Sequence, residues 1–495
     1  MQKFFQTLIV VSVLLILSGC ALKSPSVSEL AEHQIIIGDE ETVDPFLHEL
    51  MLGVISGPEP TANGTGPTLT KEYQDIGVVS VRNNDYYDDR LDIEGILNCG
   101  GSTYPSWEGC DATDNSHYDW TKSDAEYQAY IDGGFVPFLR IGGEWSNEEP
   151  AHDFKGPQNA IQEANWIIAA NKMVERYKNW KQKPNAFTYL NIWTEFPGKH
   201  FWDRSNPEFL KFWIEAYKSI KSAHPELKIG GPGFGAGISV KVAQGDGGIA
   251  EGFLKELYAQ KIKLDWFGWH SFGSDPTVYA KEARGYQDLL NGTGAFTDVP
   301  WAGTSFFADT EVFIDAYGNG GAQDGRGGEV LPVSTLQGAA VLTAGWISME
   351  YADIQGAFYY RGNDQGSPGS TPKKSKPGQD DSAPGLFTSA GEYKPAANAF
   401  RLWSKLTNNY KTLLTTNIPV DGTDNDVWAL AAKNSSGGVA VLVANTRNQD
   451  TTISIDDYSI GTVYLVDDSH DGRIGIAMTS STISLPAGAV ALIEL

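Results

Sequence analysis

Cysteine and basic residues are both scarce in this sequence. Three of the 495 residues are cysteine, and no Cys or His cluster has the spacing of a metal-ligand set, so we predict neither a metal site nor a cofactor. Lys and Arg number 37 against 62 Asp and Glu, which gives a formal net charge of −25 at pH 7. Because nucleic-acid binding depends on basic contacts to phosphates, this balance argues against a nucleic-acid partner.

Long apolar runs are also absent, apart from one at the N-terminus. Lys3 precedes an apolar segment of ten residues, 8–17, which is too short to span a bilayer. A small-residue cleavage pattern follows, so residues 1–20 are predicted to be a signal peptide. Cys20 directly after the pattern resembles the lipobox of bacterial lipoproteins. This implies acylation of Cys20, and Ala21 next to it implies the outer membrane of a Gram-negative bacterium. The alternative is an ordinary signal peptide with an incidental cysteine.

Export also bears on the segments that follow. Residues 21–33 contain several serines and one proline, and we predict that they form a tether. Cys99 and Cys110 are candidates for a disulfide, because exported proteins fold in an oxidising compartment.

Eight short apolar runs alternate with helical patterns between about residues 46 and 402. This alternation predicts an α/β fold, a (β/α)8 TIM barrel. After residue 402, short apolar runs separated by Gly, Asn and Asp predict a C-terminal antiparallel β-sandwich over 403–495. Residues 34–45 are expected to add a strand to that sandwich. The predicted barrel strands are 51–56, 77–82, 135–141, 187–193, 227–231, 264–270, 305–311 and 356–361.

Two glutamates, Glu195 and Glu311, follow or end two of these predicted strands. The carboxyl ends of barrel strands share one face, so both carboxylates are expected there. Two carboxylates about 5 Å apart are what a retaining glycosidase uses, one to protonate the leaving oxygen and one to attack the sugar. We therefore predict Glu195 as acid/base and Glu311 as nucleophile of a double displacement.

Several motifs then resemble one family. Trp-Thr-Glu-Phe-Pro at 193–197 is similar to the acid/base motif of glycoside hydrolase family 39, the β-xylosidase and iduronidase group. Gly-Gly-Pro at 230–232, the segment 264–272 and the pair at 310–311 resemble later motifs of that family in the same order. The resemblance, over residues 79–403, implies a retaining barrel enzyme that removes sugars from chain ends. The residues that we predict to bind substrate are Arg82, Asn83, Glu144, Trp193, Thr194, Lys199, His200, Trp269, His270, Tyr359 and Arg361.

Four departures from the family pattern surround the expected sugar. Thr194 stands where the family has Asn, Phe272 stands for Tyr, and Val312-Phe313 stands for Trp-Asn. The second strand ends with Arg-Asn-Asn at 82–84, where the family tends to have Arg-x-His. Both glutamates remain, so the departures favour an unusual sugar, such as one altered at its 2-position or an anhydro ring, over lost catalysis.

Basic residues are expected at the same face of the barrel. They can bind sulfate or carboxylate groups, which favours an acidic polysaccharide such as a sulfated algal galactan of the carrageenan or agar type. The alternatives are a solvated loop in a β-xylosidase-like enzyme for neutral glycans, and a non-catalytic surface glycan-binding lipoprotein. The basic residues are Lys199, His200, Arg204, Arg361, Lys373, Lys374 and Lys376.

Overall fold

The computed structural model describes residues 32–41, 46–58, 68–83, 91, 93–97, 110–143, 156–182, 187–199, 201–319, 332–362, 364, 384–388, 390–419 and 426–495. Within these ranges, no helix is long and apolar enough to cross a membrane. Several predictions fall outside the described residues: the signal peptide with Cys20, most of the tether, Cys99, Glu144, His200, and the lysines at 373, 374 and 376.

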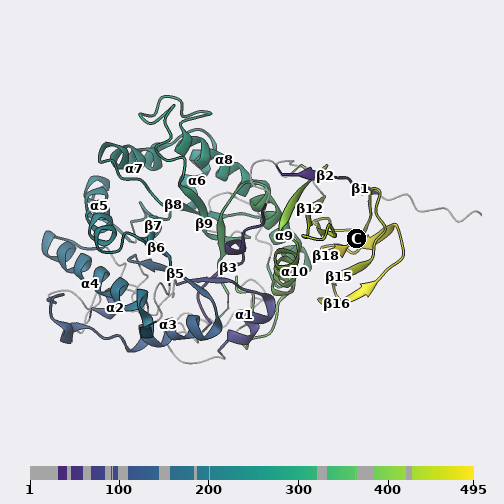
Figure 1. Cartoon of the computed structure of the whole chain (residues 1–495), viewed down its shortest axis with the longest axis horizontal. Coiled ribbons are helices and arrows are strands. Elements are labelled where there is room, and N and C mark those ends of the chain that lie inside the picture. Colours follow the sequence, from purple (N-terminus) through teal and green to yellow (C-terminus); the bar gives the residue numbers. More distant parts are fainter. Residues whose placement is uncertain are drawn as a thin grey trace, which may run out of the picture.

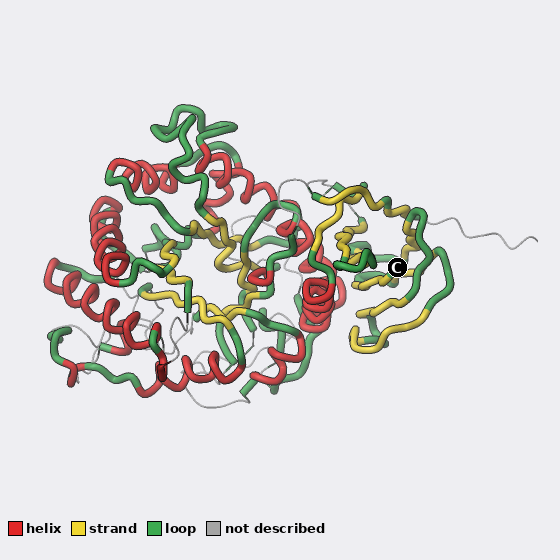
Figure 2. Tube along the Cα trace, in the orientation of Figure 1, coloured by secondary structure: helices red, strands yellow, loops and turns green. Residues whose placement is uncertain are grey.

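Eight parallel strands close into a barrel in the order β10-β3-β4-β5-β6-β7-β8-β9, and helices surround this ring (Figures 1 and 2). The predicted (β/α)8 barrel is confirmed. The strands are β3 Gly53–Ile55, β4 Ser80–Arg82, β5 Val136–Ile141, β6 Tyr189–Ile192, β7 Lys228–Gly230, β8 Trp266–Phe272, β9 Glu311–Gly318 and β10 Gly356–Tyr359.

The outer helices bury one apolar face against the barrel. Helix α5 shows how the sequence fixes the start of such a helix. Glu208 accepts hydrogen bonds from the backbone N–H and the hydroxyl of Ser205 at 3.0 and 2.7 Å, which caps its first turn. The helices are η1 Glu49–Met51, α1 Thr70–Ile76, α2 Ile93–Ile96, η2 Asn115–His117, α3 Thr121–Gly133, α4 Ala160–Lys178, η3 Trp180–Gln182, α5 Asn206–Ala223, α6 Ala236–Ala243, α7 Gly248–Ala259, α8 Thr277–Asn291, α9 Leu336–Glu350 and α10 Pro395–Asn409.

A β-sandwich follows the barrel. A seven-stranded sheet has the order β16-β15-β18-β13-β12-β11-β2, and a three-stranded sheet has the order β1-β14-β17. N-terminal strands enter both sheets, and β1 pairs with β14 in parallel. The strands are β1 His33–Ile35, β2 Ile37–Glu40, β11 Thr412–Thr416, β12 Val427–Lys433, β13 Val439–Asn445, β14 Thr451–Ile455, β15 Thr462–Val466, β16 Asp471–Ala477, β17 Thr482–Leu485 and β18 Val490–Glu494.

The seven-stranded sheet is covered on both faces. Side chains alternate along β12, so Trp428 and Leu430 join the core of the barrel and its helices, while Val427 and Ala429 join the core between the two sheets. Helices α9 and α10 lie between barrel and sheet (Figure 1). This position explains why nearly every residue of α9 is buried.

One predicted strand is wrong. The run 305–311 forms turns, and the seventh barrel strand, β9, begins at Glu311, where the prediction ended it. The other seven predicted runs overlap the observed barrel strands. The shift matters because it moves Glu311 from one end of the barrel to the other.

Candidate active site

Glu311 lies at the amino-terminal end of the barrel. It pairs with Trp266, the first residue of β8, and its carboxylate accepts hydrogen bonds from Lys228 at 2.5 Å and Tyr189 at 3.0 Å. Lys228 and Tyr189 are the first residues of β7 and β6. A carboxylate at this end of a TIM barrel serves stability rather than chemistry, because active sites are built at the other end.

Glu195 lies at the opposite, carboxyl-terminal end. It hydrogen-bonds His270, which pairs with Ala316, five residues beyond Glu311 on β9. At about 3.3 Å per residue, these five steps separate the two levels of the barrel by roughly 17 Å. The structure therefore does not bring Glu195 and Glu311 together, and the assignment of Glu311 as the nucleophile is wrong.

A strained turn presents Glu195. The chain leaves β6 through Trp193 and Glu195, whose φ angles of 76° and 46° lie in the left-handed region. For residues other than glycine this conformation costs about 1–3 kcal/mol each, and such strain gathers at functional sites. The turn leaves the Glu195 side chain 39% exposed, with one carboxylate oxygen 3.0 Å from Nδ1 of His270. An exposed carboxyl held by a buried imidazole is suited to proton transfer.

A chain of buried polar groups continues below His270. Its Nε2 lies 3.8 Å from Oδ1 of Asp315. The other carboxylate oxygen of Asp315 is 3.2 Å from Arg82, which also donates to Asn191 at 2.6 Å. The side chains of Asp315, Arg82 and Asn191 are fully buried. Four strands, β4, β6, β8 and β9, thus supply one interior network that ends at Glu195.

Backbone features make room for this network. The pairing of β8 with β9 shifts register between Trp269 and His270, so Asp315 is the extra residue of a β-bulge; bulges often redirect a side chain beside an active site. Gly233, at φ 64°, packs against the network: a Cβ there would lie 2.7 Å from Oδ2 of Asp315 and 3.4 Å from Nε2 of His270. Gly233 is therefore required for space as well as for its φ.

Both ring nitrogens of His270 face a carboxyl group. Nδ1 lies 3.0 Å from an oxygen of Glu195, and Nε2 lies 3.8 Å from Oδ1 of Asp315. The imidazole therefore links the exposed carboxyl of Glu195 to the buried network.

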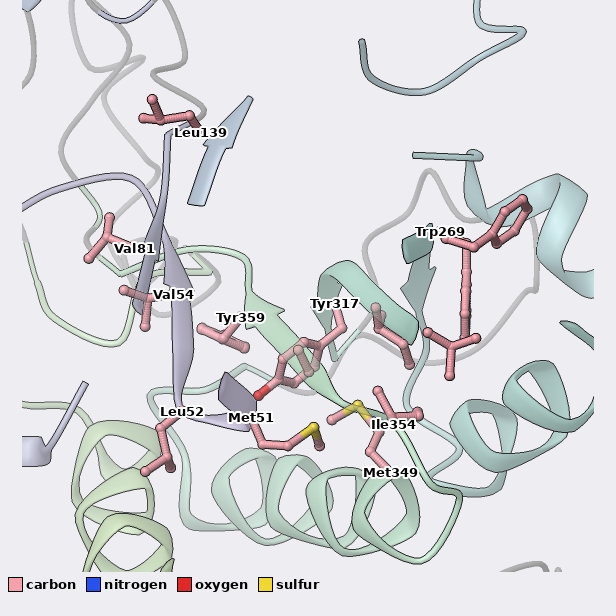
Figure 3. Packing of buried hydrophobic residues seen from close by; sticks show 14 of the residues in the cluster. Met51, Leu52, Val54, Val81, Leu139, Trp269, Tyr317, Met349, Ile354 and Tyr359 are labelled. Atoms are coloured by element: carbon pink, nitrogen blue, oxygen red, sulfur yellow. The ribbon is translucent and has the colours of Figure 1, made fainter. Parts of the chain in front are cut away.

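Three aromatic residues predicted to bind substrate lie in the core instead. Trp193 and Trp269 are fully buried, and Tyr359 is 1% exposed. Figure 3 shows Tyr359 and Tyr317 among packed apolar side chains, and Trp269 in the same cluster. The Tyr359 hydroxyl donates to the carbonyl of Pro384 at 2.6 Å. These three side chains build the barrel, and their prediction as sugar contacts is wrong.

The remaining predicted residues have mixed positions. Asn83 is buried, and its amide donates to the backbone carbonyls of Leu91 and Arg140 at 3.0 and 2.8 Å. Asn83 therefore connects two backbone segments. Thr194 is buried beside Glu195, and its hydroxyl has no hydrogen-bond partner among the described residues. Arg361 is nearly buried, and Lys199 is exposed.

Cys110 is disulfide-bonded. Its predicted partner, Cys99, lies outside the described residues.

Sequence reasoning missed Asp315 and Asn191. Each is a polar residue within an apolar strand, Val-Phe-Ile-Asp-Ala-Tyr and Tyr-Leu-Asn-Ile. A lone charge in such a run signals a buried partner, because an unpaired buried charge is too costly.

Comparison with solved structures places the fold. The chain is similar to a glucosidase from Croceicoccus marinus, with 18% identity, a TM-score of 0.67, and coverage of 93% of this chain and 98% of that one. A monomeric β-xylosidase from Caulobacter crescentus CB15 gives 15% identity, a TM-score of 0.63, and coverage of 93% and 99%. A GH39 enzyme from Xanthomonas axonopodis pv. citri has 15% sequence identity and a TM-score of 0.62. The match covers 95% of this chain and 99% of that one. No family model matches the sequence. At these identities the likeness establishes the fold.

Proposed function

We propose that this chain is a glycoside hydrolase in which Glu195 is the general acid and then the general base. The observation that carries the proposal is the exposed carboxyl of Glu195 at the carboxyl end of the barrel, 3.0 Å from buried His270. The fold shared with a glucosidase and a β-xylosidase supports it.

Asp315 acts through His270 in this proposal. Since the two ring nitrogens of His270 face Glu195 and Asp315, the carboxylates lie within roughly 9 Å of each other, a range that glycosidases use. Asp315 is fully buried, however, and does not face a sugar. We therefore assign it as a positioning residue whose carboxylate lies 3.8 Å from Nε2 of His270. The retaining course stays a prediction, now without an assigned nucleophile, and NMR of the first-formed anomer tests it.

The proposed substrate is an acidic glycan, cleaved from a chain end. The support comes from the sequence of the lysine-containing segment after β10 and from Lys199, which is exposed after β6. Arg204 no longer contributes, because Glu163 and Glu208 pair with it at 2.6 and 2.9 Å. Export and lipid anchoring through Cys20 are part of the proposal and rest on the sequence of residues 1–20.

The test compares Glu195→Gln with Glu311→Gln in the protein without residues 1–20. Neutral aryl glycosides and sulfated or uronic oligosaccharides serve as substrates. Loss of a general acid/base lowers kcat by about 10²–10⁴-fold, so Glu195→Gln should lose nearly all turnover. Glu311→Gln should keep it, because its carboxylate lies at the other end of the barrel.

Each other outcome changes the conclusion. Release of sugar only from neutral xylosides would favour the β-xylosidase-like alternative. If the parent protein bound glycans and cleaved none of them, the glycan-binding lipoprotein would replace the enzyme; the displaced Glu311 is the observation that keeps that alternative in view.

A further inference from the structure

A hollow lies outside the barrel, between the C-terminal half of α4 and the segment that contains η2. We call it the α4 groove; Tyr118, Trp120, Lys172, Arg176, Trp180 and Lys181 line it. Its volume is about 880 Å³, which falls in the range of ligand sites. None of the residues of the candidate active site lines it, so the two are separate.

Aromatic rings form one wall of the groove. Tyr118 and Trp120 lie nearly parallel, with an interplanar angle of 3° and centroids 5.2 Å apart. Both are half-buried, so their remaining surface borders the groove. Such rings pair an apolar face with a polar tip, which suits the mixed surface of a sugar.

Cations are held over these rings. The Nζ of Lys172 lies 4.6 Å from the ring centroid of Tyr118. The guanidinium carbon of Arg176 lies 4.8 Å from the ring centroid of Trp120. The Nζ of Lys181 lies 5.3 Å from the ring centroid of Trp180. Cation–π contact fixes each charge before any ligand arrives, which lowers the entropic cost of binding.

Two of the three charges keep their capacity for an anion. Arg176 is paired with Asp124 at 2.5 Å. Lys172 donates instead to the neutral oxygens of Asn115 and Thr113 at 2.8 and 3.2 Å, and Lys181 donates to the amide of Gln128. Neither lysine has a carboxylate within ion-pair distance in the part of the chain that the structure describes.

The charge balance of the groove runs against that of the protein. Glu175 is its one acidic lining residue among those the structure describes. At its far edge, burial and then the positive charge of Lys178 lower the pKa of His224. The described lining therefore carries more positive than negative side chains, on a chain with a net charge of −25.

We propose that the α4 groove is a second glycan-binding site, selective for sugars that carry sulfate or carboxylate groups. The inference rests on the proposed function, since it takes the bound glycan to be of the substrate's class. The rings contact the sugar, and Lys172 and Lys181 bind its anionic groups.

The experiment is affinity electrophoresis of Glu195→Gln protein, which removes turnover from the measurement. Gels contain κ-carrageenan, alginate or neutral xylan. The double variant Lys172→Gln/Lys181→Gln keeps the alkyl stems of similar length and removes both charges. Lys261→Gln is the matched control, because Lys261 is an exposed lysine 4.3 Å from the centroid of Tyr258, away from the groove.

We expect κ-carrageenan or alginate to retard the parent protein, and the double variant to bind that polymer at least tenfold more weakly. Lys261→Gln should match the parent. Equal retardation of the double variant, equal retardation by xylan, or no retardation of the parent in any gel would each overturn the inference. Hydrolysis of small aryl glycosides by protein with Glu195 intact is measured separately, so failure of the groove and failure of the enzyme are distinguishable.

Discussion

At the residue scale, β9 carries two carboxylates whose surroundings give them different tasks. Glu311 is partly exposed and pairs with Lys228 at the amino-terminal end of the barrel. Asp315, four residues on, is fully buried and faces Arg82 and His270. The same charge on the same strand is thus a partly solvated ion pair in one place and part of a buried network in the other.

This contrast gives a matched pair of variants. Asp315→Asn should lower kcat at least tenfold and shift the acidic limb of its pH profile, because a neutral amide removes the negative charge that lies 3.8 Å from Nε2 of His270. Glu311→Gln should leave kcat and the profile unchanged and cost about 0–1 kcal/mol of unfolding free energy, as partly exposed ion pairs do. Rate–pH profiles and urea unfolding measure both. A merely structural role for Asp315 would lower its stability and leave the profile of the folded fraction in place.

Gly233 provides a second prediction at this scale. Alanine there meets a left-handed φ and places a Cβ 2.7 Å from Oδ2 of Asp315. We expect Gly233→Ala to cost at least 1–3 kcal/mol and to lower kcat in the protein that remains folded. Gly237→Ala is the control: it lies in α6, and a Cβ added there would meet nothing within 4 Å, so it should stabilise slightly. Equal stability of the two variants would contradict the spatial requirement at Gly233.

The sequence supports only part of this site. Glu195 and His270 follow recognisable strand motifs, and both meet at the predicted end of the barrel. Asp315 is visible as a charge in an apolar run, but its partner Arg82 is 233 residues away, and a single sequence offers no means to pair them. The buried Trp193, Trp269 and Tyr359 show the opposite problem, since an aromatic side chain near a strand end has the same pattern whether it faces sugar or core.

At the element scale, strand β9 explains the main error. Phe306 and Phe307 imitate a buried strand in the sequence, yet they lie in turns and pack edge to face, with centroids 4.7 Å apart. They also contact Tyr258 and Trp301 on the outside of the barrel. Periodicity reports that side chains are buried, but not which layer buries them.

Helix α5 gives a prediction on pH. Hydrogen bonds from the Ser205 hydroxyl, Arg204 and the Ser205 backbone lower the pKa of Glu208 from 4.5 to about 2. Because the folded pKa is depressed, the stabilisation is present above pH 4.5 and is lost as the pH falls towards 2. Glu208→Gln should therefore have a lower Tm than the parent at pH 7, and the difference should shrink as the pH approaches 2.

The control for that series lies on the same helix. Glu215, 3.9 Å from Lys211, has no part in the cap, so Glu215→Gln accounts for the removal of one negative charge. If the difference in Tm between Glu208→Gln and the parent stayed constant from pH 7 to 2, the cap would not depend on ionisation of Glu208.

At the scale of the whole molecule, barrel and sandwich share one core. Trp428 and Leu442 of the seven-stranded sheet belong to the same buried cluster as Trp403 of α10 and Trp346 of α9. Trp346 and Trp403 stack at 5.3 Å, and the indole N–H of Trp403 donates to Thr343 at 3.1 Å. The sheet therefore covers α9 and α10, which favours a bracing role for it.

A shared core predicts that damage in the sheet is felt in the barrel. Trp428 is 2% exposed, and removing a buried tryptophan side chain costs about 3–5 kcal/mol. Trp428→Ala should lower both the temperature at which the sheet melts and the temperature at which the barrel loses glycan turnover, by the same amount. Ile474→Ala, at a position 79% exposed on β16 of the same sheet, should change neither, because surface substitutions usually stay within about 0.5 kcal/mol. If Trp428→Ala melted the sheet early and left the inactivation temperature unchanged, the two parts would be independent, and α9 would have to be stable with one face open to water.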